Sequence, residues 1–121
     1  MVYLSLSVED IDQSRIFYVD ILQLFKVQSG NRLICNSGVD FILDLYQVGT
    51  AEHESVFGKP EQLKASFMLR FEDDSLPLLA ELKANSVLYE LNDNIAGSFL
   101  RLKDPSGNEI TISHQNCGGI C

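Results

Sequence analysis

The sequence predicts an α+β fold made of two units, each with the element order βαβββ. Alternating apolar and polar residues mark the strands, and amphipathic stretches mark the helices. The same order of elements occurs twice, with a period of about sixty residues. The 121 residues suffice for one domain with a buried core and are too few for two. We therefore expect one domain over residues 1–114, with units at about 1–47 and 65–114, a connection at 48–64 and a flexible tail at 115–121.

The first unit opens with a strand and a helix. Over residues 3–8 aromatic or polar side chains alternate with apolar ones, so the two sets fall on opposite faces of a strand. A helix is predicted over 12–24, with Asp12 as its N-cap. Ile16 and Val19 begin its buried stripe at helical spacing.

Three further strands are predicted in the first unit, at 25–28, 32–36 and 40–47. The Ser-Gly-Asn and Ser-Gly turns separate them. Residues 48–64 show no clear period and contain two glycines and a proline, so they predict a long irregular connection. His53 lies in this connection between two glutamates and is expected to be exposed to solvent.

The second unit repeats the order. Its strand, helix and three strands are predicted at 65–72, 74–86, 87–91, 97–103 and 108–113. Asp73 or Asp74 can cap the helix, and Pro77 is tolerated in its first turn. Asp-Pro-Ser-Gly-Asn at 104–108 is a strong turn signal between the last two strands.

Charge and cysteine content narrow the classes of function. The net charge is −8 and no basic stripe exists, so nucleic acid is not an expected partner. The apolar runs are only strand-length, so no membrane partner is expected. No basic, apolar leader begins the chain, and the three cysteines are an odd number, so a cytoplasmic protein with reduced thiols is predicted. The acidic charge favours cationic ligands, although solubility alone would explain it.

Two motifs resemble one known family. Residues 7–18 (Ser-Val-Glu-Asp-Ile-Asp-Gln-Ser-Arg-Ile-Phe-Tyr) resemble an opening strand, an acidic turn and a helix carrying "S…FY". Residues 99–108 (Phe-Leu-Arg-Leu-Lys-Asp-Pro-Ser-Gly-Asn) resemble a closing "F-x-x-x-x-DP-x-GN" hairpin. Both are similar to the glyoxalase/bleomycin resistance protein/dioxygenase (vicinal oxygen chelate) superfamily. The resemblance implies curved mixed sheets around a cleft, and a homodimer that completes its clefts at a two-fold interface.

The resemblance also bears on metal binding. Metal-using members place His, Gln or Glu on the first and fourth strands of each unit, and these positions fall on Tyr3, Asp44, Ser66 and Thr111. A divalent metal needs about three protein ligands, and only Asp44 is a credible one. We therefore expect a metal-free member of the bleomycin-resistance type, with no metal and no cofactor.

Strand alternation predicts which side chains line the cleft. The expected ligand-binding residues are Asp44, Tyr3, Tyr46, Ser66, Met68, Arg70, Phe99, Arg101, Glu109 and Thr111. Ser5, Ser7, Ile42 and Ser113 share that surface. The opposite faces are expected to form the core: Leu4, Leu6, Phe41, Leu43, Phe67, Leu69, Leu100, Leu102, Ile110 and Ile112.

Asp44 allows two interpretations. It is a carboxylate in an otherwise apolar strand, so it needs a partner if it is buried. It either forms an ion pair with Arg70 or Arg101, or anchors a positively charged group of a ligand while Tyr3, Tyr46 and Phe99 cover its flat part.

Two classes of function follow. The first is a binding protein that sequesters a small cationic or aromatic compound, as in antibiotic resistance. The alternative is an enzyme of the same fold: a lyase, a ring-cleaving dioxygenase or an antibiotic thiol transferase. Such an enzyme would use a metal, or Asp44 or Glu109 as a general acid or base. The sequence leaves open whether the cleft lies within one chain or between two chains.

Overall fold

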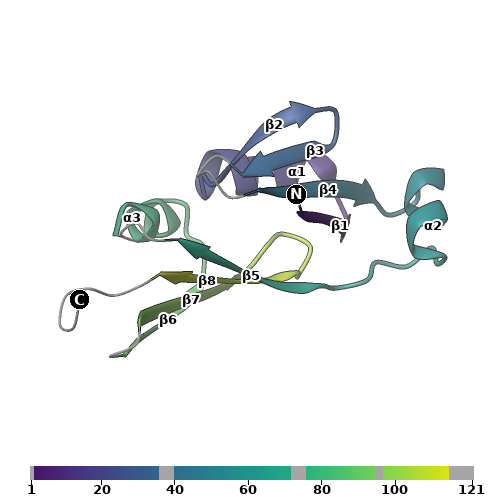
Figure 1. The fold of residues 1–121 in the computed structure, drawn as a ribbon. Helices are drawn as coiled ribbons and strands as arrows, with labels where there is room; N and C mark the ends of the chain where they lie inside the picture. The colour runs from purple at the N-terminus through teal and green to yellow at the C-terminus, as the bar shows by residue number, and fades with distance from the viewer. Residues whose placement is uncertain (1, 36–39, 72–75, 95–96, 115–121) are drawn as a thin grey trace.

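The chain folds into two four-stranded mixed sheets (Figure 1). The structure, a computed structural model, describes residues 2–35, 40–71, 76–94 and 97–114. In chain order the elements are β1 (Val2–Val8), α1 (Ile11–Arg15), η1 (Ile16–Ile21), β2 (Phe25–Ser29), β3 (Arg32–Cys35), β4 (Phe41–Gln47), α2 (Ala51–Phe57), β5 (Ser66–Phe71), α3 (Leu76–Ala84), β6 (Tyr89–Asn94), β7 (Gly97–Lys103) and β8 (Glu109–His114). The predicted α+β class with paired βαβββ units is therefore confirmed.

Both sheets have the same topology. The first is ordered β1-β4-β3-β2 and the second β5-β8-β7-β6. In each sheet the first and last strands of the unit pair in parallel, and the other pairs are antiparallel. Two parallel neighbouring strands must be joined by a crossover connection. In each unit this connection contains the helix that follows the first strand.

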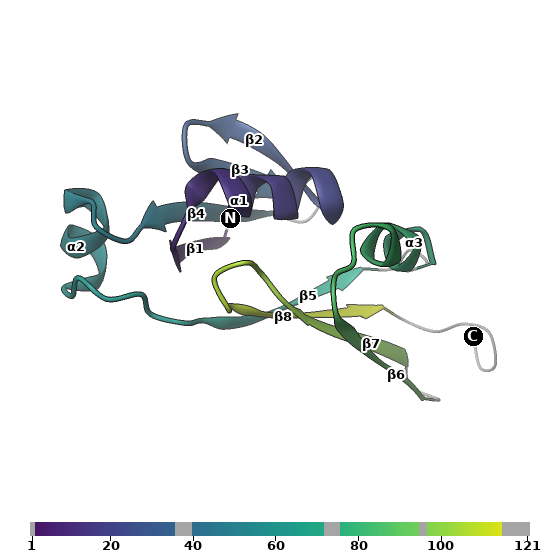
Figure 2. The ribbon, with the colours of Figure 1, turned by 180° about the vertical axis from the view of Figure 1, so that it is seen from behind.

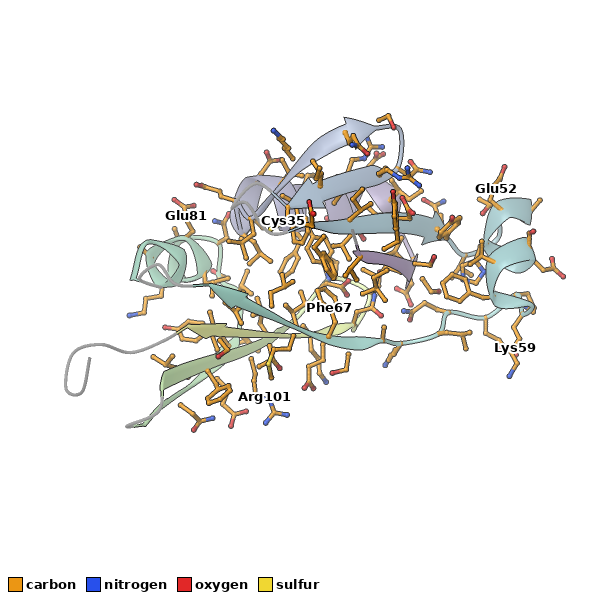
Figure 3. All side chains as sticks on the ribbon, viewed as in Figure 1. Cys35, Glu52, Lys59, Phe67, Glu81 and Arg101 are labelled. Carbon is orange, nitrogen blue, oxygen red and sulfur yellow. The ribbon has the colours of Figure 1, made fainter. Side chains whose placement is uncertain are left out.

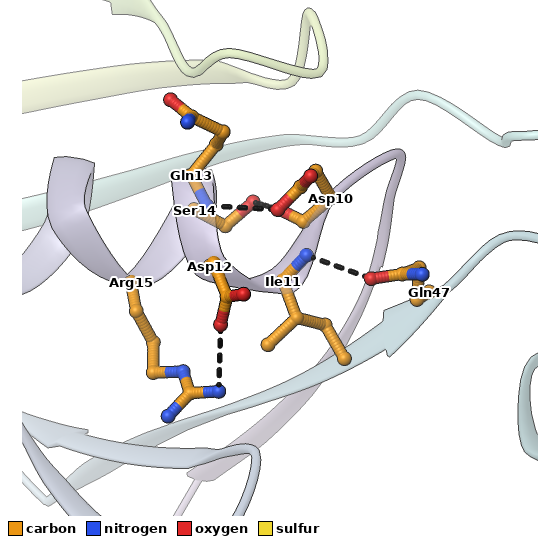
Figure 4. Close-up of polar contacts among 7 residues, drawn as sticks. All are labelled: Asp10, Ile11, Asp12, Gln13, Ser14, Arg15 and Gln47. Carbon is orange, nitrogen blue, oxygen red and sulfur yellow. Dashed lines mark hydrogen bonds and ion pairs between the residues drawn. The ribbon is translucent and has the colours of Figure 1, made fainter.

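The cap of α1 differs from the sequence prediction (Figure 4). Asp10 is the N-cap, and its Oδ1 accepts a hydrogen bond from the Gln13 N–H at 3.0 Å. The predicted cap, Asp12, lies in the first turn of the helix and pairs with the Arg15 guanidinium at 3.2 Å. Either aspartate side chain could serve as an N-cap, and Asp10 is the one with the extended backbone that a cap requires.

Helix α1 continues as the π-helical segment η1. The Leu22 N–H donates to the Phe17 carbonyl at 2.9 Å, which is the wider i→i+5 spacing. The helical region therefore ends at Ile21 and not at the predicted Leu24. The wider turn sends Phe17 and Tyr18 together into the core.

The connection between the units contains a helix that the sequence did not predict. The Thr50 hydroxyl caps α2 by accepting from the His53 N–H at 3.2 Å. Gly58 ends the helix in the left-handed region (φ 71°) and donates its N–H to the Glu54 carbonyl at 2.8 Å. Both views of the fold place α2 at one end of the molecule, beyond the ends of β1 and β4 (Figures 1 and 2).

Several boundaries in the second unit also shift. Strand β6 begins at Tyr89, two residues later than predicted. Helix α3 ends at Ala84 and not at residue 86. The predicted caps Asp73 and Asp74 and the tail at 115–121 lie outside the described residues.

The core lies between the two sheets. The inner-face residues predicted from alternation are buried there or packed against it, as expected. Phe41 of β4 and Phe67 of β5 stack with ring centroids 6.0 Å apart, so the two sheets meet directly (Figure 3). Within the described part of the chain, no helix has the length and apolar character needed to cross a membrane.

Candidate functional site

The predicted site residues lie on the sheet faces that point away from the core. We call these the outer faces. The outer face of the first sheet carries Tyr3, Ser5, Arg32, Asp44 and Tyr46, and that of the second sheet carries Ser66, Met68, Phe99, Arg101, Glu109 and Thr111. The inner faces meet in one core, so the outer faces point in opposite directions. Figure 3 shows this for Arg101, which extends from the second sheet away from the first. One chain therefore does not bring the two sets together.

Arg32 holds Asp44 on the first outer face. The guanidinium binds both carboxylate oxygens, with Nε–Oδ1 at 2.7 Å and Nη2–Oδ2 at 3.2 Å. Arg32 lies directly opposite Asp44 in the antiparallel β3–β4 pair, which explains the bidentate geometry. The partner of Asp44 among the described side chains is therefore Arg32 and not the expected Arg101. The side chain of Arg70 lies outside the described residues, and Arg101 belongs to the other outer face.

Tyr3 completes this cluster. The guanidinium carbon of Arg32 lies 5.2 Å from the centre of the Tyr3 ring, close enough for a cation–π contact. The hydrogen bond to Asp44, and then the Asp44 charge, raise the pKa of Arg32, so the guanidinium stays charged. The Arg32 side chain is 42% exposed and that of Asp44 only 16%. The guanidinium of Arg32 is therefore the more exposed member of the ion pair.

Helix α2 closes one end of the first outer face. Its Phe57 ring contacts the Tyr46 ring edge-on, with centroids 6.0 Å apart. An open cavity of about 340 Å³ lies beside this contact. Its lining residues are Ile11, Ser29, Asn31, Arg32, Asp44, Leu45, Tyr46, Gln47, Thr50 and Glu52.

Ser7 and His53 form a buried pair under α2. Ser7 Oγ lies 2.6 Å from His53 Nε2 and also accepts the Leu63 N–H at 3.1 Å. Both side chains are inaccessible, at 1% and 0% exposure, so His53 is not the exposed residue that the sequence predicted. Ser7 does not line an open surface either. A substrate cannot reach this pair, and its role is to hold α2 against β1.

The second outer face carries a similar ion pair. Arg101 Nη2 lies 3.2 Å from Glu109 Oε1, and Met68 lies exposed beside them. Arg101 sits opposite Thr111 in the β7–β8 pair, as Arg32 sits opposite Asp44 in the β3–β4 pair. In each unit an arginine on the third strand therefore lies opposite this fourth-strand position.

A larger open cavity lies at the β6 edge of the second sheet. Its volume is about 560 Å³, and Phe17, Ile21, Val87 and Leu88 form much of its wall. Of the predicted site residues it includes only Arg101 and Glu109, so it is largely separate from the predicted site.

The two sequence motifs contact each other. The Tyr18 hydroxyl from the first motif donates to Asp104 Oδ2 in the second motif at 2.8 Å. Asp104 Oδ1 also accepts the N–H groups of Ser106 and Asn108, at 2.9 and 2.8 Å. The Asn108 side chain then donates to the Ser7 carbonyl at 3.0 Å. These motif residues join the two units in the interior and do not line an outer face.

Comparison with known proteins bears on the fold. No protein-family model and no curated protein matches the sequence. Among solved structures, a glyoxalase/bleomycin resistance protein from Streptomyces sp. CB03234 superposes with a TM-score of 0.73 and 20% identity, covering 93% of this chain and 98% of that one. The chain has the glyoxalase/bleomycin-resistance fold.

Other proteins with the glyoxalase/bleomycin-resistance fold have different activities. TnmS3, an antibiotic binding protein from the same Streptomyces strain, has a TM-score of 0.68 and 23% identity, with 94% of this chain and 93% of that one covered. A lactoylglutathione lyase from Agrobacterium tumefaciens has a TM-score of 0.67 and 16% identity, with 99% and 96% covered. The shared fold therefore does not select between binding and catalysis.

The metal positions implied by the resemblance can be tested against the geometry. Tyr3, Ser66 and Thr111 offer only hydroxyls, and the carboxylate of Asp44 is already bound by Arg32. Among the described residues, no three His, Cys, Asp or Glu side chains gather where they could hold a metal ion. This donor set does not fit a divalent metal.

Proposed function

We propose that the protein is a homodimer that binds a small aromatic compound without a metal. Each of two clefts would combine the first outer face of one chain with the second outer face of its partner. The observation that carries this proposal is the opposite direction of the two outer faces, which leaves each half of the site open in one chain. A two-fold dimer supplies the missing half twice.

Membership of the glyoxalase/bleomycin-resistance superfamily is part of the proposal. Its support is the contact between the two motifs that resemble the family, through Tyr18 and Asp104, together with the fold. By this proposal the chain is closer in function to the antibiotic binding neighbour than to the lyase.

The ion pairs support binding over catalysis. A general base needs a carboxylate that is available to take a proton from a substrate. Asp44 is held by Arg32 in a bidentate pair, and Glu109 is held by Arg101. Neither carboxylate is free for that role, and the donor set does not fit a metal that could act as a Lewis acid.

A compound panel tests the proposal. Purified protein is heated with aromatic antibiotics and other small aromatic compounds, each with and without EDTA. A ligand at one hundred times its Kd stabilises the native state by about 2.7 kcal/mol, which raises the unfolding temperature by several degrees. We expect at least one compound to give this shift in both conditions. If every shift disappears with EDTA, binding needs a metal and the proposal is wrong. If no compound gives a shift, the proposed binding function is also wrong.

A further inference from the structure

Arg32 and Arg101, one on each outer face, indicate the charge of the ligand. Arg32 and Arg101 lie at the same place in the two units, each opposite the fourth-strand position where the resemblance would put a metal ligand. In the proposed dimer, Arg32 of one chain and Arg101 of its partner face the same cleft. We infer that the cleft takes a planar aromatic compound that carries a carboxylate or a similar anionic oxygen group. This inference rests on the proposed dimeric cleft.

Arg32 has donors to spare for such a ligand. A guanidinium has five N–H groups, and two of them bind Asp44. The other three contact no acceptor among the described residues. The guanidinium rests on the Tyr3 ring, which leaves its opposite face for an aromatic ligand to stack on.

The exposure of the pair disfavours a cationic ligand. The Asp44 side chain is 16% exposed and already paired with a cation, whereas the Arg32 side chain is 42% exposed. In the second ion pair the arginine is again the more exposed member, because the Arg101 side chain is 48% exposed and that of Glu109 is 34% exposed. A ligand that enters the cleft therefore meets guanidinium groups before carboxylates. The net charge of −8 acts against an anion only at long range, and salt screens it beyond about 8 Å.

Two matched probes test the inference. Naphthoate and naphthylmethylammonium have the same ring system and opposite charges. Isothermal titration of the wild-type protein should give a Kd for naphthoate that is about tenfold lower than that for the ammonium probe, because a charge-assisted hydrogen bond to Arg32 forms only with the anion. Equal affinities, or tighter binding of the ammonium probe, would overturn the inference.

Variants connect this preference to Arg32. Replacing Arg32→Gln together with Asp44→Asn removes both charges and leaves no buried carboxylate unpaired. This double variant should bind the two probes with similar Kd values. Arg32→Lys keeps the charge and should retain most of the preference, which also serves if the double variant fails to fold. The matched control is Arg15→Gln with Asp12→Asn, which removes an exposed ion pair on α1 (Figure 4) and should keep the full preference.

The outcomes separate the inference from the proposed function. If the aromatic panel yields a ligand but naphthoate is not preferred, the inference fails and the binding function stands. If naphthoate is preferred equally by wild type and by the Arg32/Asp44 double variant, the anion site lies elsewhere and the inference also fails. If neither the panel nor the probes bind, both are wrong.

Discussion

The Tyr18 hydroxyl is one of the groups that join the two motifs, beside the Asn108 side chain. It donates to Asp104 Oδ2 at 2.8 Å in the interior, and a hydrogen bond to a charged group contributes about 1.5–3 kcal/mol. Tyr18→Phe keeps the ring and should lower the free energy of unfolding by that amount in urea denaturation. Tyr89→Phe is the control, because the Tyr89 hydroxyl has no polar partner among the described residues. Equal effects of the two substitutions would contradict the assigned role.

The same residue predicts how stability changes in alkali. Burial, then the charge of Asp104 and its hydrogen bond, raise the pKa of Tyr18 well above its usual value. The folded protein keeps this phenol protonated while the unfolded chain loses the proton above about pH 10. Above that pH the unfolded state binds fewer protons than the folded state. The contribution of Tyr18 to stability is therefore fully present below about pH 10 and is lost as the pH rises. The loss of stability between about pH 9.5 and 11 should be smaller in Tyr18→Phe than in wild type.

Strand alternation predicted the face of a residue but not its partner. Asp44 lies on the outer face, as the pattern of β4 indicated, because side chains alternate strictly along a strand. Its partner Arg32 was missed. Which residue lies opposite Asp44 depends on the register of β3 against β4, and that register is set by the turn between them and by packing. The sequence signal for this partner was the presence of an arginine, Arg32, on the strand that precedes β4.

At the level of elements, α2 depends on His53 for its attachment to the first sheet. The imidazole is fully buried, bonds Ser7 Oγ at 2.6 Å and lies against the Phe57 ring at 4.7 Å. His53→Ala removes the hydrogen bond and leaves a cavity, so the free energy of unfolding should fall by about 2–4 kcal/mol. The exposed neighbour Glu54 is the control, and Glu54→Ala should change stability by less than about 0.5 kcal/mol.

Hydrogen exchange distinguishes a local effect from a global one. In His53→Ala the amides of α2 should exchange faster than those of β5–β8, because the lost contact joins α2 to β1 alone. A uniform change across both sheets would show that His53 supports the whole core and not this helix.

Elements with a clear period could be predicted, and α2 could not. The strands of both units and the inner-face core followed from alternation, and most boundaries agreed within two residues. Helix α2 has seven residues. These are too few for a helical periodicity to be recognised in a connection that also contains two glycines and a proline. The signals that it did carry were local: Thr50 as a cap three residues before His53, and Gly58 at its end.

The relative placement of the two units was beyond the reach of the sequence. Each unit has an apolar face and a mixed face, and alternation separates these faces correctly. Nothing in a strand pattern states whether the apolar faces of the two sheets meet each other or the mixed faces do. The structure joins the apolar faces, because that arrangement removes the most apolar surface from water. The mixed faces therefore remain available to a second chain.

Mixing two defective variants tests whether the cleft is shared between chains. One variant carries Arg32→Gln and Asp44→Asn on the first outer face, and the other carries Arg101→Gln and Glu109→Gln on the second. Each alone should bind naphthoate weakly, and light scattering should give a mass of about twice 13.5 kDa for both. In a mixed dimer one cleft receives both defects and the other receives none. After random exchange of subunits, about one quarter of all clefts should therefore bind naphthoate with wild-type affinity. A cleft closed within one chain could not be restored by mixing, so the absence of any tight sites in an exchanged sample, or a monomeric mass, would refute the shared cleft.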